Sequence, residues 1–470
     1  MKARRLSPMD AVFLYMETRE TPMHVAGLMI FSLPKGAPAD FCRQLVAELR
    51  AGREFHKPWN LRLQSPKLKS LGHAWVEDHD LDLEYHVRHS ALPAPGGERE
   101  LGQLVARLHS NPIDFNRPPW EFHLVEGLEN GRFAIYIKLH HALIDGVSGT
   151  RLIHRCLVTD AGDLEQPLFW AMPRAQKESS GESAYGVEAA SGPFEQLRSQ
   201  VQSLPDVARA FRRLFKAAVS KADPLLVPFQ APSSRLNDRV KGQRRFATQQ
   251  YTVDRFKKLA KAGDCSLNDI VLAVCGGALR RFLLEQGELP SKSLTTGIPV
   301  SVRPKDDDSG GNAISMMIAT LGTDIADPRQ RLQQIAASTR DAKAHLQSLP
   351  KSAIQQYTVL FLAPYTAQML TGIGAHARPI FNVIISNVPG PTEPLYLRGA
   401  RLESTYPVSV PSHGQALNIT CHSYAGTLNF GFTGCRDTLP HMQHIAVYCG
   451  EALEELEAEL LQPVRRRKAA

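Results

Sequence analysis

The sequence predicts an α/β protein with two domains, on the basis of three observations. The chain has 470 residues, a length that favours two domains, and its 43% hydrophobic content can fill two cores. Strand-like and helix-like periodicities alternate in both halves of the chain. Between the halves, residues 160–192 change to a composition rich in Gly, Ser, Glu, Ala and Pro, which is typical of a linker. The predicted division is therefore 1–160, 161–245 and 246–470.

In the first half, the clearest element is a hairpin of strands 120–126 and 132–141, joined across Asn130-Gly131. Strand periodicity places His141 on one face with Phe133, Ile135, Ile137 and Leu139, and His140 on the opposite face. The other elements predicted in this half are a strand at 25–33 and helices at 38–50, 98–109 and 149–159.

The second half is predicted to begin near residue 249 with an extended segment that leads into a helix. A second helix follows, capped by Ser266 or Asn268. The remaining predicted elements are strands at 294–302, 312–321 and 382–386, a hairpin of 416–422 with 427–433, and helices at 328–346 and 440–461.

Residues 194–218 have apolar positions near helical spacing, accompanied by basic residues that include Arg212 and Arg213. A basic amphipathic helix can lie on a membrane or lipid-droplet surface. It can equally pack on the two domains with its basic face in water, and the pattern leaves both possibilities open.

Composition and charge restrict the remaining function classes. The net charge of +8 suits a phosphate-bearing ligand or an anionic membrane surface, and no zinc-finger or RNA-binding motif indicates a nucleic-acid partner. The seven scattered cysteines, without a Cys-x-x-Cys motif, indicate reduced thiols in a cytosol. Polar residues interrupt the uncharged stretch 352–377, which is expected to form buried helices rather than a membrane span. The predicted location is cytoplasmic, with peripheral association to the inner membrane or to lipid inclusions.

The stretch His140 to Gly149 contains the residues best suited to chemistry. A histidine at a strand end can accept and return a proton near neutral pH, so His141 is the candidate general base for a hydroxyl that attacks an activated acyl carbonyl. A thioester donor would release a thiol of pKa roughly 8–9, which leaves with little assistance. Asp145 could fold back to hydrogen-bond a histidine or a basic residue, and Gly146 allows a sharp turn.

Three other interpretations of this stretch are weighed. The histidines could be satisfied core residues. His140, His141 and Asp145 could bind a metal, but the two histidines diverge in a strand and no Cys or second His cluster supports them, so no metal is expected. Ser148 could form an acyl-enzyme, although its glycine-rich surroundings indicate turn chemistry and no Gly-x-Ser-x-Gly elbow is present.

The motif His140-His141-x-x-x-Asp145-Gly146 resembles the signature of the coenzyme-A-dependent acyltransferase superfamily, which includes chloramphenicol acetyltransferase and peptide condensation domains. Further stretches are similar to motifs of bacterial wax ester synthase/diacylglycerol acyltransferases, in family order: the opening 6–14, Arg117-Pro118-Pro119-Trp120, Asn268-Asp269 and Asn387-Val388-Pro389-Gly390-Pro391. The sequence departs from the family at Pro119, where leucine is usual. Trp120 is expected to pack the hairpin rather than touch substrate.

The resemblance implies two chloramphenicol-acetyltransferase-like domains with mixed sheets and an active-site tunnel between them. It implies that the second histidine, His141, is the base and that Asp145 mainly holds the architecture. Asn268 could orient the catalytic histidine or a loop, or only cap its helix. Arg303 could meet a coenzyme A phosphate or form a structural ion pair.

The function implied is direct transfer of a fatty acyl group from acyl-coenzyme A to a long-chain alcohol, diacylglycerol, or both, with no further cofactor. Two rivals are a condensation-type enzyme that takes its acyl group from a carrier protein, and a non-enzymatic protein that binds lipid surfaces. The motifs near 117–120 and 387–391 disfavour the first rival, and the intact histidine motif disfavours the second.

Overall fold

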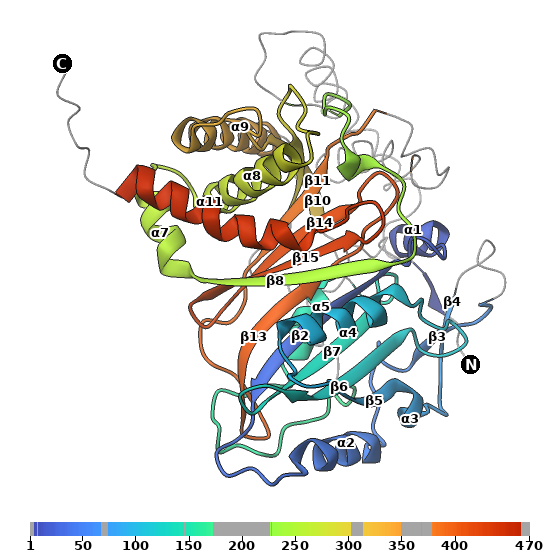
Figure 1. Cartoon of the computed structure of the whole chain (residues 1–470). Coiled ribbons are helices and arrows are strands. Elements are labelled where there is room, and N and C mark those ends of the chain that lie inside the picture. Colours follow the sequence, from blue (N-terminus) through green and yellow to red (C-terminus); the bar gives the residue numbers. More distant parts are fainter. Residues whose placement is uncertain are drawn as a thin grey trace, which may run out of the picture.

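The computed structural model describes residues 4–6, 8–66, 74–144, 146–172, 226, 228–301, 314–348, 368 and 378–461. Two six-stranded sheets of mixed strand direction form the framework, and helices pack on both (Figure 1). The mixed sheets with helices in both halves confirm the predicted α/β fold class. A third, three-stranded sheet of order β1-β4-β3 lies beside the first half.

The elements of the first half are β1 (Arg4–Arg5), α1 (Pro8–Met16), β2 (His24–Ser32), α2 (Phe41–Ala51), β3 (Leu61–Leu63), β4 (Ala74–Glu77), α3 (Leu83–His86), β5 (Val87–Ala91), α4 (Glu98–Ser110), β6 (Trp120–Leu128), β7 (Arg132–His140) and α5 (Gly146–His154). The predicted hairpin is confirmed as β6 and β7. The helix after the histidines begins at Gly146, three residues before the predicted start. Gly146 therefore belongs to the helix rather than to the turn.

The elements of the second half are β8 (Arg244–Thr252), α7 (Val253–Ala262), α8 (Leu267–Glu285), β9 (Thr295–Ser301), β10 (Ile314–Thr320), α9 (Pro328–Gln347), β11 (Val383–Val388), β12 (Tyr396–Leu397), β13 (Ala400–Val408), β14 (Leu417–Tyr424), β15 (Thr427–Cys435) and α11 (Gln443–Leu461). The predicted strands, helices and hairpin of this half all have counterparts here. β12 and β13 were not predicted.

The first sheet has the order β12-β13-β2-β7-β6-β5. Alternation along β7 places Phe133, Ile135 and Ile137 in one core with α2, and Ala134 and Tyr136 in another core with α4. The two helices therefore cover opposite faces of the sheet. This burial on both faces holds β7, and with it the paired histidines, in one register.

The second sheet has the order β10-β9-β11-β14-β15-β8. Its largest core joins the sheet to α7, α8 and α11, and α8 is buried along most of its length. β11 runs parallel to both β9 and β14, so its carboxyl end points the same way as theirs.

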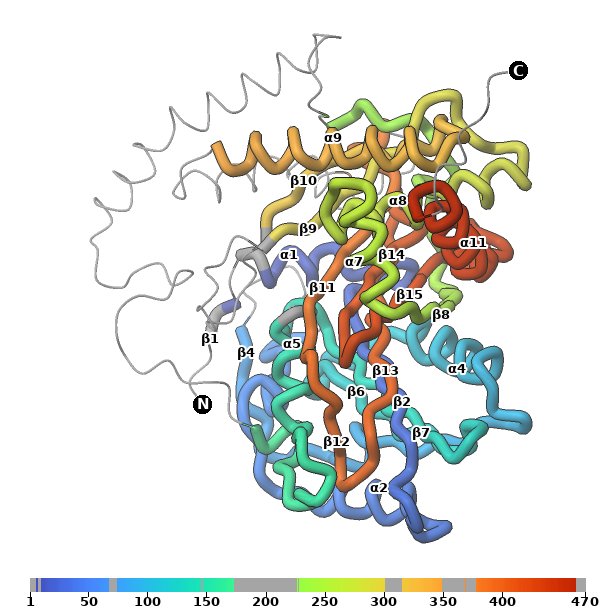
Figure 2. Tube along the Cα trace, turned by 90° about the vertical axis from the view of Figure 1, so that its left-hand side faces the viewer, coloured from blue at the N-terminus to red at the C-terminus, as the bar shows by residue number. Residues whose placement is uncertain are grey.

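β13 connects the halves, because it comes from the second half of the chain but pairs with β2 in the first sheet (Figure 2). It also passes close to β15, where a Cβ on Gly431 would lie 1.9 Å from the carbonyl oxygen of Pro407. Only glycine allows this approach between the two backbones.

The predicted domain division at residues 160 and 246 stays a prediction, but the described residues near it are not all linker-like. Phe169 and Trp170 lie in the core of the first half, and Leu236 and Val240 lie in the core of the second. The amphipathic segment 194–218 lies outside the described residues, as does all of 352–377 except Gln368. Among the helices described, none is long and apolar enough to cross a membrane.

Candidate active site

The hairpin of β6 and β7 ends at the two histidines, as the sequence predicted. His140 is the last residue of β7 and pairs with His24 of β2. Its side chain is fully buried and meets the ring of Phe115 edge-on at 4.8 Å. The backbone N–H of Ala142 donates to His140 Nδ1 at 3.1 Å, so the neutral ring carries its proton on Nε2. His140 Nε2 lies 3.3 Å from the Glu17 carboxylate, to which it can donate.

His141 lies one residue beyond the strand and has different surroundings. Its backbone N–H donates to the carbonyl of Met23 at 2.9 Å, which fixes the main chain at this position. Its ring stacks on Phe13 of α1, with ring centroids 4.0 Å apart and the planes 15° from parallel. The residue is partly exposed whereas His140 is fully buried, so His141 is the more accessible of the two histidines. The Nδ1 atom of His141 is buried.

The turn after the histidines leads into α5. Asp145 lies outside the described residues, so its predicted structural role stays a prediction. Gly146 begins the helix, and a Cβ there would meet nothing within 4 Å. Ser148 lies partly buried in the first turn of the helix. The two histidine rings point to different surroundings, and no group of three metal-ligating side chains is found within the described part of the chain.

Glu17 is a site residue that the sequence analysis did not identify. Its carboxylate is only 3% exposed, and Oε2 meets both His140 Nε2 and the backbone N–H of Met23. Met23 in turn accepts from His141, so one carboxylate supports both histidines, one directly and the other through Met23. Glu17 follows α1 in the polar stretch Glu17–Glu20, which has no periodicity and gives no signal of burial.

A buried ionic cluster lies on the face of β7 that also carries His140. The Lys138 ammonium is fully buried, lies 2.8 Å from Glu121 and donates to the carbonyls of Leu108 and Asn111. Burial acts to raise the pKa of Glu121, but the hydrogen bond from His123 and the Lys138 charge prevail and lower it to about 2. A paired charge held by several hydrogen bonds makes this part of β7 rigid.

Trp120 packs the hairpin, as predicted. It is fully buried, its Nε1 donates to the carbonyl of Trp59 at 2.7 Å, and its ring stacks on His86 and Trp170. Its backbone N–H bonds to Pro118, and Pro119 accepts from the His140 N–H at 3.0 Å. Since this contact uses a backbone carbonyl, the departure from leucine at Pro119 does not remove it.

The predicted site residues of the second half are not brought to the histidines by any described contact. Asn268 is the second residue of α8, whose cap is Ser266, completed by Asp269 in a capping box. Asp269 also accepts from Thr339 of α9 at 2.6 Å, which ties the two helices together. In the described part of the chain Asn268 makes no hydrogen bond to either histidine. Arg303 lies outside the described residues.

The Pro-Gly-Pro turn after β11 packs directly on His422 of β14. A Cβ on Gly390 would lie 2.3 Å from the Ser423 carbonyl oxygen and 2.5 Å from His422 Nε2. The His422 ring also lies 5.4 Å from that of His154 in α5, the helix that follows the histidine motif. The turn is therefore packed against β14. His422 of that strand in turn lies beside α5.

Replacing Gly390 with alanine is expected to lower the free energy of unfolding by about 1–3 kcal/mol, because backbone must shift to admit the Cβ. Thermal denaturation checks this result. Gly27→Ala is the matched control, since a Cβ there meets nothing within 4 Å. Equal stability of the two variants would contradict the close packing at Gly390.

Several buried histidines make the protein sensitive to acid. Burial lowers the pKa of His86 and His154 to about 4 and of His109 and His422 to about 3. The unfolded chain takes up these protons near pH 6.5 and the folded chain does not, so stability is full above that pH and falls as the pH drops toward the folded pKa values. Each buried histidine is expected to remove about 2 kcal/mol between pH 6.5 and pH 5.

Denaturant titrations of wild type and His422→Leu at both pH values measure this effect. The variant is expected to lose less stability on acidification than wild type, and an identical loss would contradict a neutral, buried His422.

Comparison with known proteins decides the family. The catalytic-domain model of wax ester synthase/diacylglycerol acyltransferases matches residues 6–271, and the C-terminal-domain model of the same family matches residues 310–457. The chain belongs to this family. It is accordingly an acyltransferase, and the resemblance drawn from the motifs is confirmed.

Similar proteins agree over nearly the full length. A Mycobacterium tuberculosis protein that carries the name of a diacylglycerol O-acyltransferase is 50% identical, with 97% of each chain covered. The O-acyltransferase WSD of Acinetobacter baylyi is 38% identical, again with 97% of each chain covered. The solved wax ester synthase/diacylglycerol acyltransferase of Marinobacter aquaeolei has a TM-score of 0.79 and 37% identity, covering 98% of this chain and 100% of that chain.

More distant structures share the fold. The first condensation domain of the calcium-dependent antibiotic synthetase has a TM-score of 0.59 at 15% identity, covering 98% of this chain and 97% of that chain. This likeness confirms the predicted chloramphenicol-acetyltransferase-like α/β architecture.

Proposed function

We propose that this acyltransferase moves a fatty acyl group from acyl-coenzyme A to a long-chain alcohol, to diacylglycerol, or to both, by direct transfer with His141 as general base. The observation that supports it most is the contrast between the two histidines. His140 is buried and tied to Glu17, whereas His141 is partly exposed on a fixed backbone. The names of the relatives support the choice of acyl acceptors.

The chemistry needs one nitrogen that can accept and return a proton. His141 Nε2 accepts the hydroxyl proton of the acceptor as its oxygen attacks the thioester carbonyl. The tetrahedral intermediate then collapses with cleavage of the C–S bond, and the thiolate takes the proton back from His141. The products are an ester and free coenzyme A. Ser148 is not needed as a nucleophile, and the tunnel, Asn268 and Arg303 stay predictions in this scheme.

Acceptor-dependent release of coenzyme A thiol tests the proposal. Palmitoyl-coenzyme A is incubated with wild-type protein alone, with hexadecanol and with a diacylglycerol. Direct transfer predicts thiol release only when an acceptor is present, and the better acceptor identifies the preferred activity. Release without acceptor, together with acylated protein that disappears in Ser148→Ala, would replace direct transfer by an acyl-enzyme. Turnover with an acyl carrier protein only would favour the condensation-type alternative.

The water-insoluble acceptors suggest a lipid surface as the place of reaction. We propose peripheral association with the inner membrane or lipid inclusions, supported by the net charge of +8 and by the basic pattern of residues 194–218. Charge reversal at Arg212 and Arg213 is expected to weaken binding to anionic phospholipid vesicles in a flotation assay. Unchanged binding would count against a role for this segment, and tight binding by a protein without turnover would favour the lipid-binding alternative.

A further inference from the structure

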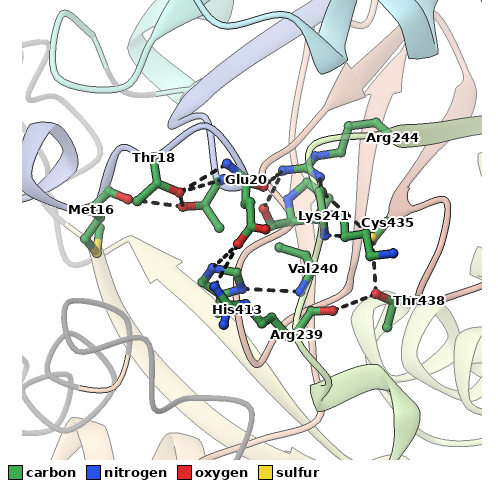
Figure 3. Close-up of polar contacts among 12 residues, drawn as sticks. Met16, Thr18, Glu20, Arg239, Val240, Lys241, Arg244, His413, Cys435 and Thr438 are labelled. Atoms are coloured by element: carbon green, nitrogen blue, oxygen red, sulfur yellow. Dashed lines mark hydrogen bonds and ion pairs between the residues drawn. The ribbon is translucent and has the colours of Figure 1, made fainter.

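Arg244, the first residue of β8, is buried, and no carboxylate among the residues that the structure describes forms an ion pair with it. Its guanidinium donates to three backbone carbonyls from separate segments: Lys241, Glu20 at 2.7 Å and Pro411 at 3.3 Å (Figure 3). Its backbone N–H donates to the Ser110 hydroxyl at 2.9 Å. The residue is 3% exposed, and burial lowers its pKa to about 10, so it is charged at neutral pH. One side chain from the second half of the chain thus holds the segment that follows α1.

The held segment is stiff. The hydroxyls of Thr18 and Thr21 lie 2.7 Å apart, and Thr21 also donates to the carbonyl of Met16 at 3.2 Å. The Thr18 hydroxyl accepts from the backbone N–H groups of Glu20 and Thr21. These side-chain to backbone bonds close residues 16–21 into a local turn and restrict its backbone.

The same segment carries the groups that place the histidines. Glu17 lies one residue before Thr18, and Met23 lies two residues after Thr21. The Glu17 carboxylate meets His140, and the Met23 carbonyl accepts from the His141 N–H. Arg244 is thus bonded to the Glu20 carbonyl of the same short segment, 17–23, that contacts both histidines through Glu17 and Met23.

We propose that Arg244 is a positioning residue for the acyl transfer, which holds the segment 17–23 at the distance that sets His141 against the substrates. This inference rests on the proposed role of His141. It adds that a residue of the second half, outside the histidine motif, controls the geometry of the base. A misplacement of the base by about 1 Å, even from a change far from the chemistry, can lower the rate by about 100-fold. Because such a misplacement acts on the transfer step rather than on substrate binding, loss of Arg244 is expected to lower kcat.

The exposed neighbour Arg239 provides a matched control. Its guanidinium meets the Glu20 carboxylate at 3.0 Å, and His413 meets the same carboxylate at 3.4 Å (Figure 3). The Arg239 side chain is 64% exposed, and exposed ion pairs contribute little. Arg239→Met therefore removes an arginine from the same glutamate without touching its carbonyl.

Kinetics of the wild type, Arg244→Lys, Arg244→Ala and Arg239→Met test the inference, with palmitoyl-coenzyme A and hexadecanol in the thiol-release assay. Arg244→Ala is expected to lower kcat by about 100-fold and Arg244→Lys by about 10-fold, with KM for both substrates within about twofold of wild type. Guanidinium ion added to Arg244→Ala is expected to restore most of the lost kcat, whereas sodium chloride at equal ionic strength is not. Arg239→Met is expected to behave as wild type.

A role confined to holding the fold together predicts another pattern: a lower melting temperature for Arg244→Lys with kcat unchanged. That result, or a kcat of Arg244→Ala within about twofold of wild type, would overturn the inference. His141→Ala, measured in parallel, separates the two proposals. If that variant stays active, the general-base role fails, and the comparison of Arg244 with Arg239 still reports whether the carbonyl contact governs turnover.

Discussion

Replacing His141 with alanine is expected to lower kcat by about 10²–10⁴-fold, the range that a positioned general base contributes. This expectation follows from the immediate surroundings of His141. His141 stands at the end of a strand buried on both faces, with its backbone bonded to Met23 and its ring stacked on Phe13. The loss is expected in kcat with either acceptor, because no other described histidine offers a partly exposed ring on this turn. The measurement is acceptor-dependent thiol release from palmitoyl-coenzyme A.

The control is His79→Ala, because His79 is exposed and remote from the strand end in sequence. It is expected to keep wild-type activity. If the His141→Ala variant retained most of its turnover, this result would contradict the role of His141 as general base. The family assignment would remain, since it rests on both domains.

Replacing Glu17 with glutamine is expected to lower kcat by about 10–100-fold with KM for both substrates little changed. Glutamine keeps the shape and one acceptor oxygen, but it removes the charge and presents a neutral amide to His140 Nε2 and the Met23 N–H. Breaking a charge-assisted, buried bond is also expected to lower the free energy of unfolding by about 1–3 kcal/mol. Steady-state kinetics and denaturant titration measure the two effects separately.

Glu20→Gln is the matched control for Glu17. Its carboxylate belongs to the same segment but is 41% exposed, so its pairing with Arg239 is expected to contribute about 1 kcal/mol or less. If Glu17→Gln and Glu20→Gln had the same kcat, the carboxylate of Glu17 would have no positioning role. A drop in kcat for Glu17→Gln alone would support a positioning role for the Glu17 carboxylate, because the two variants differ mainly in how deeply the replaced carboxylate is buried.

The elements that the sequence predicted well are those with regular local patterns. β6 and β7 have alternating side chains and an Asn-Gly turn, and α4 and α9 agree with their predicted bounds to within one residue at each end. β13 has no such regularity. Its register against β2 shifts between Leu402 and Ser404, and Pro407 lies within the strand, so period-two alternation is broken twice. Its place in the first sheet depends on pairing with residues 369–382 positions earlier, from Arg401 with Ser32 to Val408 with Ala26.

The α/β class, the paired histidines at a strand end and the acyltransferase family could all be predicted from the amino-acid sequence. These follow from local periodicity, turn chemistry and short motifs, all of which are properties of neighbouring residues. The tertiary structure was needed to show that His140 is buried and His141 partly exposed, that Glu17 contacts His140, and that Arg244 bonds to the Glu20 carbonyl. Glu17 lies in a polar stretch without periodicity and Arg244 is a charged residue at the start of a strand, so their burial arises from contacts between chain segments far apart in sequence. Contacts between segments far apart in sequence produce no pattern among neighbouring residues. They can therefore be identified only once the folded structure is known.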